Sequence, residues 1–155
     1  MSHVTHLEVV PLSEVPLNGA SYRNPPVVLV VDDERTIADT LSVILAKNGF
    51  AVLTAYDARS ALELAHVIPP DLLLSDVVMR PDMDGTELAI AVVTAIPDCR
   101  ILLFSGHAAT VDLLVKARGM GHDFHLLTKP VHPADLLVRI RESLASSPQV
   151  SAGCS

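Results

Sequence analysis

Three aspartates stand directly after apolar runs in this sequence, where carboxylates are well placed to hold a metal ion. Asp32 and Asp33 follow the run 27–31, and Asp76 follows a second run that ends at Ser75. Neighbouring carboxylates repel one another unless a cation lies between them, and carboxylate oxygens with water suit Mg²⁺. We therefore take the three aspartates as candidate Mg²⁺ ligands.

Lys129 and Ser105 add a positive charge and a hydroxyl to this set. Both groups can bind phosphate oxygens, and a carboxylate nucleophile beside them would form an aspartyl-phosphate. Phosphoryl transfer of this kind needs positioning and charge neutralisation more than covalent help from the protein. Taken singly, each residue also has a plain structural explanation: a cap or turn for Asp32, Asp76 and Ser105, and solvent exposure for Lys129.

Strand and helix patterns alternate five times between residues 26 and 145. Continuous runs of β-branched residues and leucine predict buried strands, and apolar residues at helical spacing predict helices between them. The expected strands are 27–31, 51–55, 72–75, 101–104 and 124–127, and the expected helices lie around 34–48, 58–67, 88–95, 109–118 and 133–144. Such alternation predicts an α/β fold with a parallel sheet covered on both faces. The side chains that follow the strands then meet at one edge of the sheet, where α/β proteins bind ligands.

The composition is that of a folded domain. Half of the 155 residues are hydrophobic, and the formal net charge is −7 with no cluster of Lys and Arg, so we expect neither nucleic acid nor an anionic membrane as a partner. No signal peptide is recognisable, and no apolar run approaches the roughly 20 residues of a membrane span, so a cytoplasmic protein is expected. Cys99 and Cys154 have neither metal-ligand nor redox spacing and are expected to be free thiols.

Prolines and small polar residues set the two ends apart. We predict a flexible extension over residues 1–25, one folded domain over 26–145 and a disordered tail over 146–155.

Five stretches resemble the response regulator receiver domains of bacterial two-component systems. In the family's order and at about its spacing, they are Val-Val-Asp-Asp-Glu (30–34), Leu-Leu-Leu-Ser-Asp-Val-Val-Met (72–79), Met-Asp-Gly (83–85), Leu-Phe-Ser-Gly (103–106) and Thr-Lys-Pro (128–130). The resemblance covers nearly all of the expected domain. It implies a flavodoxin-like, doubly wound fold with five parallel strands in the order 2-1-3-4-5.

The resemblance also implies a role for each site residue. Asp76 matches the phospho-acceptor, and Ser105 and Lys129 match the pair that grips the phosphoryl oxygens. The matched Mg²⁺ ligands are Asp33 directly, Asp32 through water, Asp76 itself and the backbone carbonyl of Val78.

The resemblance implies that the chain is a signalling domain rather than an enzyme. The only chemistry expected of it is its own phosphorylation and dephosphorylation. The phosphodonor would be a sensor histidine kinase or a histidine phosphotransfer protein, and the downstream protein is unknown. Because the expected domain leaves no room for an output domain, we predict a stand-alone response regulator. Phosphorylation would rearrange the face formed by the fourth helix, fifth strand and fifth helix, through which two copies could also pair.

Two features depart from the family pattern. The loop 79–85 is one residue longer than usual, and Leu126 stands at the switch position where the family usually has an aromatic residue that moves with Ser105. Phe124, two residues earlier, should lie on the same strand face as Leu126.

Three other functions compete with this interpretation. A flavin- or nucleotide-binding protein would need a phosphate cradle where Asp32, Asp33 and Glu34 stand. A metal-dependent phosphatase would need a further acid or base, for which His107 is the only candidate at the site. A pseudo-receiver would use the same fold as a docking module without phosphorylation.

Overall fold

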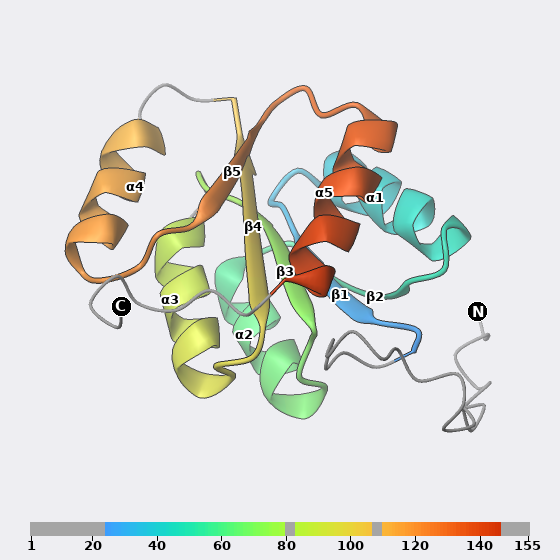
Figure 1. The fold of residues 1–155 in the computed structure, drawn as a ribbon, viewed down its shortest axis with the longest axis horizontal. Helices are drawn as coiled ribbons and strands as arrows, with labels where there is room; N and C mark the ends of the chain where they lie inside the picture. The colour runs from blue at the N-terminus through green and yellow to red at the C-terminus, as the bar shows by residue number, and fades with distance from the viewer. Residues whose placement is uncertain (1–23, 80–82, 107–109, 147–155) are drawn as a thin grey trace.

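The computed structural model describes residues 24–79, 83–106 and 110–146, in which five strands and five helices alternate (Figure 1). In chain order these are β1 (Val27–Val31), α1 (Arg35–Lys47), β2 (Ala51–Ala55), α2 (Ala58–Val67), β3 (Leu72–Asp76), α3 (Gly85–Ala95), β4 (Arg100–Ser105), α4 (Thr110–Gly119), β5 (His125–Thr128) and α5 (Pro133–Ala145). The predicted extension and tail lie outside the described residues, except for residues 24, 25 and 146.

The five strands form one parallel sheet in the order β2-β1-β3-β4-β5, which confirms the predicted topology. The three central strands, β1, β3 and β4, are buried along their whole length, whereas the edge strands β2 and β5 are only partly buried. The valine- and leucine-rich sequences of the three central strands suit this position, because a central parallel strand meets apolar side chains on both faces.

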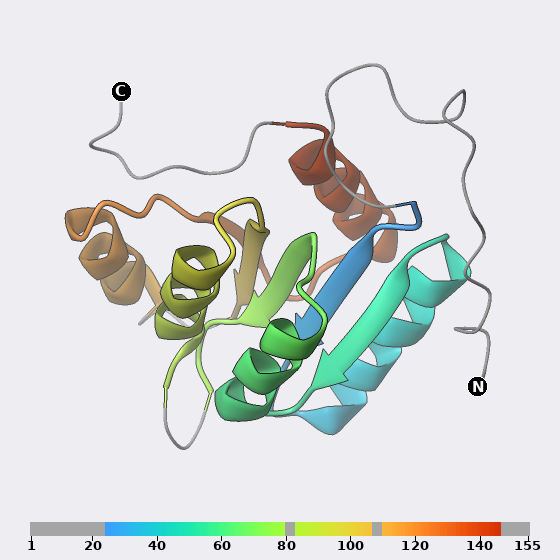
Figure 2. The ribbon, with the colours of Figure 1, turned by 90° about the horizontal axis from the view of Figure 1, so that it is seen from below.

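Helices cover both faces of the sheet, as Figure 2 shows from below. On one face, α2, α3 and α4 pack over a cluster that includes Leu73, Leu88 and Ile101. On the other face, α1 and α5 pack over a cluster that includes Leu102 and Ile140. The side chains of each central strand alternate between these two clusters, so both layers are anchored to the same strands.

Several elements reach further than their apolar runs suggested. β3 includes Asp76, β4 includes Ser105, and β5 runs on to Thr128. Backbone pairing continues through these polar residues, with Asp76 opposite Phe104 and Ser105 opposite Thr128. The hydrogen-bonded ladder depends on the backbone, so it carries polar side chains to the very edge of the sheet.

Local capping explains where two of the helices begin or end. Gly49 follows α1 at a φ of +93°, in the left-handed region that glycine adopts without strain. Asp84 caps α3 by accepting a hydrogen bond from the backbone N–H of Glu87, while the Glu87 side chain accepts one from the backbone N–H of Asp84. This capping box places the start of α3 at Gly85, directly opposite the end of β3.

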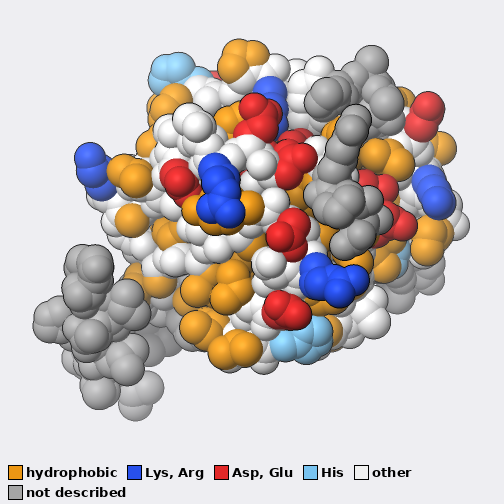
Figure 3. Space-filling model, turned by 180° about the vertical axis from the view of Figure 1, so that it is seen from behind, with side chains coloured by type: hydrophobic (Ala, Val, Ile, Leu, Met, Phe, Trp, Pro, Cys, Tyr) orange, Lys and Arg blue, Asp and Glu red, His pale blue; other side chains and the backbone are white. Residues whose placement is uncertain are grey.

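The surface carries both signs of charge. On the face that Figure 3 shows, Lys and Arg side chains stand apart from one another among acidic and hydrophobic ones. None of the helices in the described ranges is long and apolar enough to cross a membrane.

Candidate functional site

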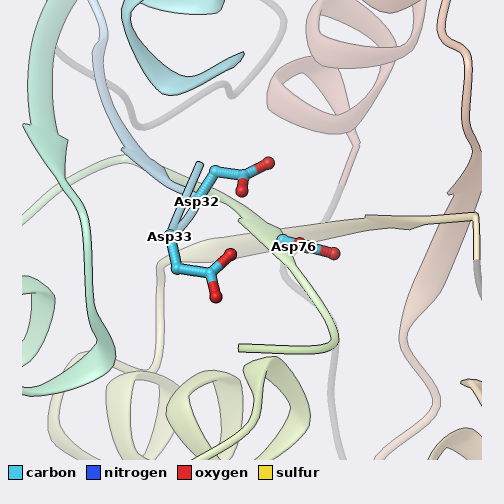
Figure 4. A group of neighbouring side chains, drawn as sticks. All are labelled: Asp32, Asp33 and Asp76. Atoms are coloured by element: carbon cyan, nitrogen blue, oxygen red, sulfur yellow. The ribbon is translucent and has the colours of Figure 1, made fainter. Parts of the chain in front are cut away.

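The three aspartates meet at the carboxyl ends of β1 and β3, as predicted (Figure 4). Each offers a carboxylate oxygen that lies within 4.8 Å of one offered by the others. Asp32 is 0% exposed and Asp76 is 3% exposed, whereas Asp33 faces solvent. β1 and β3 are neighbours in the sheet, which is why residues 44 positions apart along the chain share one site.

Lys129 completes the site from the end of β5. Its Nζ lies 3.2 Å from Oδ2 of Asp32 and 3.3 Å from Oδ2 of Asp76. The Lys129 side chain is only 21% exposed, so the alternative explanation of Lys129 as an ordinary solvent-exposed lysine is wrong. A single ammonium therefore bridges two buried carboxylates that would otherwise repel each other.

Asp32 has a local structural contact as well. Its Oδ1 accepts a hydrogen bond of 2.9 Å from the backbone N–H of Glu34. Glu34, not Asp32, is the N-cap residue of α1, and its own side chain makes no capping bond. The turn therefore fixes one oxygen of Asp32, while the other oxygen contacts Lys129.

Burial and charge set the pKa of each buried group in the site. Burial raises the pKa of Asp32 above its ordinary value, and the nearby Asp76 raises it further, against the backbone N–H of Glu34 and the charge of Lys129. Burial also raises the pKa of Asp76, with Lys129 as the main opposing influence. Burial alone would lower the pKa of Lys129, but the charges of Asp76 and Asp32 outweigh it and raise that pKa.

One carboxylate oxygen supports a cation at this site. Oδ1 of Asp76 is buried and accepts no hydrogen bond from the part of the chain that the structure describes. An unsatisfied buried oxygen is costly, and a hard cation would satisfy it together with Asp33. The donor set is all oxygen, which fits Mg²⁺. Val78, which is half-buried, lies two residues beyond Asp76.

Ser105 lies at the same edge of the sheet, buried as the last residue of β4. In the described residues α4 begins at Thr110, five residues beyond Ser105. The carbonyl of Ser105 accepts a hydrogen bond of 3.0 Å from the backbone N–H of Lys129, so the two residues are held side by side. At the next position, a Cβ on Gly106 would lie 3.4 Å from Cβ of Lys129. His107, the candidate acid or base of a phosphatase, lies outside the described residues.

Leu126 lies on β5, whereas Phe124, which was predicted to begin that strand, lies one residue before it. Phe124 is buried in the cluster beneath α3 and α4, and Leu126 packs against the same cluster, so the two side chains share a face. The Phe124 ring stacks on His122, with the ring centres 5.6 Å apart. Leu126 is half-buried, and its part in a switch stays a prediction.

Two residues of the site were not singled out from the sequence. Gly85 begins α3 against the end of β3, where a Cβ would clash with the backbone oxygen of Asp76. Phe104 places its ring beneath Lys129, with Nζ 4.9 Å from the ring centre. Both stood in stretches that resemble the family, Met-Asp-Gly and Leu-Phe-Ser-Gly, but neither had been given a role of its own.

Comparison with known proteins identifies what this chain is similar to. The profile of the response regulator receiver domain matches residues 28–141. A probable transcriptional regulatory protein, TcrX of Mycobacterium tuberculosis (strain ATCC 25618 / H37Rv), is 33% identical over 120 residues. That match covers 77% of this chain and 50% of TcrX, so the chain spans about half the length of this curated relative.

Solved structures agree in fold. A CheY-like receiver domain protein from Methanospirillum hungatei JF-1 is 31% identical with a TM-score of 0.68, over 77% of this chain and 93% of that one. The chemotaxis protein CheY4 of Vibrio cholerae is 30% identical with a TM-score of 0.67, over 76% of this chain and 98% of that one.

Proposed function

The chain belongs to the response regulator receiver domain family, and from that membership we propose that it signals by accepting a phosphoryl group on Asp76 in a Mg²⁺-dependent step. The observation that carries the proposal is the environment of Asp76. Its carboxyl group is buried, one oxygen has no hydrogen bond partner within the described residues, and the other lies 3.3 Å from the Lys129 ammonium. A carboxylate in such a place is kept for a reacting group or a cation.

Each neighbouring residue has a defined task in this proposal. Asp33, Asp76 and the backbone carbonyl of Val78 would hold Mg²⁺, and Asp32 would hold it through water. When bound, Mg²⁺ offsets the negative charge of the acids and of the phosphoryl oxygens. Lys129 supplies a second positive charge, and Ser105 a hydroxyl donor, on the side of β4 and β5.

The proposed step is a simple displacement at phosphorus. An oxygen of Asp76 forms a bond to the phosphorus of a phosphohistidine as the phosphorus–nitrogen bond breaks, and the imidazole leaves with the bonding electrons. Buried charges arranged in advance around the transferring group are the main source of catalysis in such reactions. The donor would be a sensor histidine kinase or a histidine phosphotransfer protein.

For the output, we propose the face of α4, β5 and α5. Large apolar side chains are exposed there, with Val115 63% exposed on α4 and Val138 52% exposed on α5. Phosphorylation would rearrange this face and so change its binding to a downstream protein or to a second copy. A local change of charge at Asp76 would thereby affect a distant binding surface.

Incubation with Mg²⁺ and acetyl phosphate tests the proposal. We expect intact-mass spectrometry to show the addition of one phosphoryl group, abolished by EDTA and reversed by hydroxylamine, which cleaves acyl phosphates. A wild-type protein that stays folded, binds Mg²⁺ and gains no phosphate would contradict the proposal and favour a docking module.

The acidic site should also make stability depend on pH and metal. The raised pKa values of Asp32 and Asp76 mean that the folded state keeps these protons at pH values where the unfolded chain has lost them. Stability without metal therefore falls as the pH rises from about 3.8 through the raised pKa values, while the contribution of Lys129 is lost only above its ordinary pKa of 10.5. Mg²⁺ binds the ionised acids, so at 100 times its dissociation constant it should add about 2.7 kcal/mol near neutral pH and little near pH 4.

Urea unfolding with and without Mg²⁺ at these two pH values measures the effect. Asp33→Asn should lose most of the gain, whereas Asp98→Asn, an exposed acid between α3 and β4, should keep it. An equal gain at both pH values would show that Mg²⁺ acts elsewhere.

A further inference from the structure

Phe104 is fixed to the segment that carries the acceptor. It stands directly opposite Asp76 in the register of β4 and β3. Its carbonyl accepts a hydrogen bond of 3.1 Å from the backbone N–H of Val77, the residue after Asp76. The ring is 2% exposed and packs in the cluster beneath α1 and α5. Any group held by this ring is therefore held at a set place relative to Asp76.

The group on this ring is the Lys129 ammonium, 4.9 Å from the ring centre. The same Nζ contacts Asp32 at 3.2 Å and Asp76 at 3.3 Å. An ammonium has three N–H donors, and an aromatic face attracts a cation without accepting a conventional hydrogen bond. Two donors are thus taken by the carboxylates, and the third stays available to a phosphoryl oxygen.

Packing alone does not fix the Lys129 side chain. A cavity of about 380 Å³ opens beside it, lined mainly by apolar residues of α1, α5 and the adjoining strand ends, among them Ile37, Leu41, Phe104 and Leu136. With free space along the stem, the position of the ammonium depends on its electrostatic contacts. The carboxylates draw it toward the space where the cation would bind, and the ring draws it back.

We propose that Phe104 is a positioning residue for phosphoryl transfer, whose ring face holds the Lys129 ammonium beside Asp76 and out of the space between the three aspartates. The inference rests on the proposed function, since it names the group that places Lys129 for that reaction. It predicts that the negative face of the ring, and not only its size, matters.

Ring fluorination separates these two properties, because fluorine weakens the negative face while the ring keeps nearly the same shape. Phenylalanines of increasing fluorination would be placed at position 104 alone, and uptake of phosphate from acetyl phosphate measured at saturating Mg²⁺. We expect the rate to fall steadily with fluorine content, by about fivefold over the series. The same series at Phe50, whose ring lies 5.7 Å from the guanidinium of Arg141, is the matched control and should leave the rate unchanged.

A second measurement needs neither metal nor phosphodonor. In the metal-free protein, the exchange of the Lys129 ammonium protons with water, followed by NMR on ¹⁵N-lysine protein, should speed up as position 104 is fluorinated and not as position 50 is. A rate of uptake and an ammonium exchange that are both independent of fluorine content at position 104 would overturn the inference. If the wild type takes up no phosphate, the proposed function fails instead, and the NMR series still decides whether Phe104 holds Lys129.

Discussion

Asp76→Asn is expected to abolish the uptake of phosphate, lowering its rate by at least roughly three orders of magnitude. The amide keeps the size of the carboxyl group, but its oxygen is a poor nucleophile and cannot form the acyl phosphate. The other acids do not replace it, because Asp32 is tied to the backbone N–H of Glu34 and to Lys129, and Asp33 faces solvent. Intact-mass spectrometry after incubation with Mg²⁺ and acetyl phosphate checks this result.

Two comparisons make the result specific. Burial disfavours the charge on Asp76, so the Asp76→Asn variant should remain folded and be at least as stable as the wild type without metal. Asp98→Asn removes an exposed acid far from the site and should take up phosphate at the wild-type rate. Uptake by Asp76→Asn at a rate near that of the wild type would assign the acceptor to another residue.

Gly85→Ala is expected to destabilise the protein by about 3 kcal/mol. The added Cβ would clash with the backbone oxygen of Asp76 and would lie 2.8 Å from Cα of Val77. Both obstacles are backbone atoms of the strand end, which cannot rotate away as a side chain can. Relief requires α3 to move from β3, against the hydrogen bond of 2.6 Å from the backbone N–H of Gly85 to the carbonyl of Val77.

Urea unfolding measures this effect, with Gly119→Ala as the matched control. Gly119 ends α4 with no atom within 4 Å of an added Cβ and no positive φ, so alanine there should be neutral or slightly stabilising. Because the strand end carries Asp76, Gly85→Ala should also slow phosphate uptake under conditions where the protein is still folded. Equal stability changes in the two variants would show that α3 is free to move away from β3.

The sequence by itself determines the architecture of the described chain. The spacing and composition of the apolar residues suffice for this. A strand buried on both faces must be apolar throughout, as in 27–31, and the apolar residues of an amphipathic helix must recur at helical spacing. The carboxyl ends of parallel strands meet at one edge, so the positions of Asp32, Asp76 and Lys129 after their strands already predicted a shared site. The resemblance to receiver domains then added the strand order, which the sheet confirms.

Only the tertiary structure decided which of these groups touch. Lys129 and Asp32 are 97 residues apart, and their contact depends on the register of four strands. Local sequence patterns carry no information about that register. The same holds for Phe104, whose ring looks like ordinary core in the sequence and lies under the ammonium only because β4 pairs with β5. Gly85 lay outside the expected helix 88–95, and the close approach to Asp76 that excludes a side chain exists only where α3 packs against β3. Local periodicity records which residues are buried, whereas the chemistry of this site depends on distances between residues of different strands.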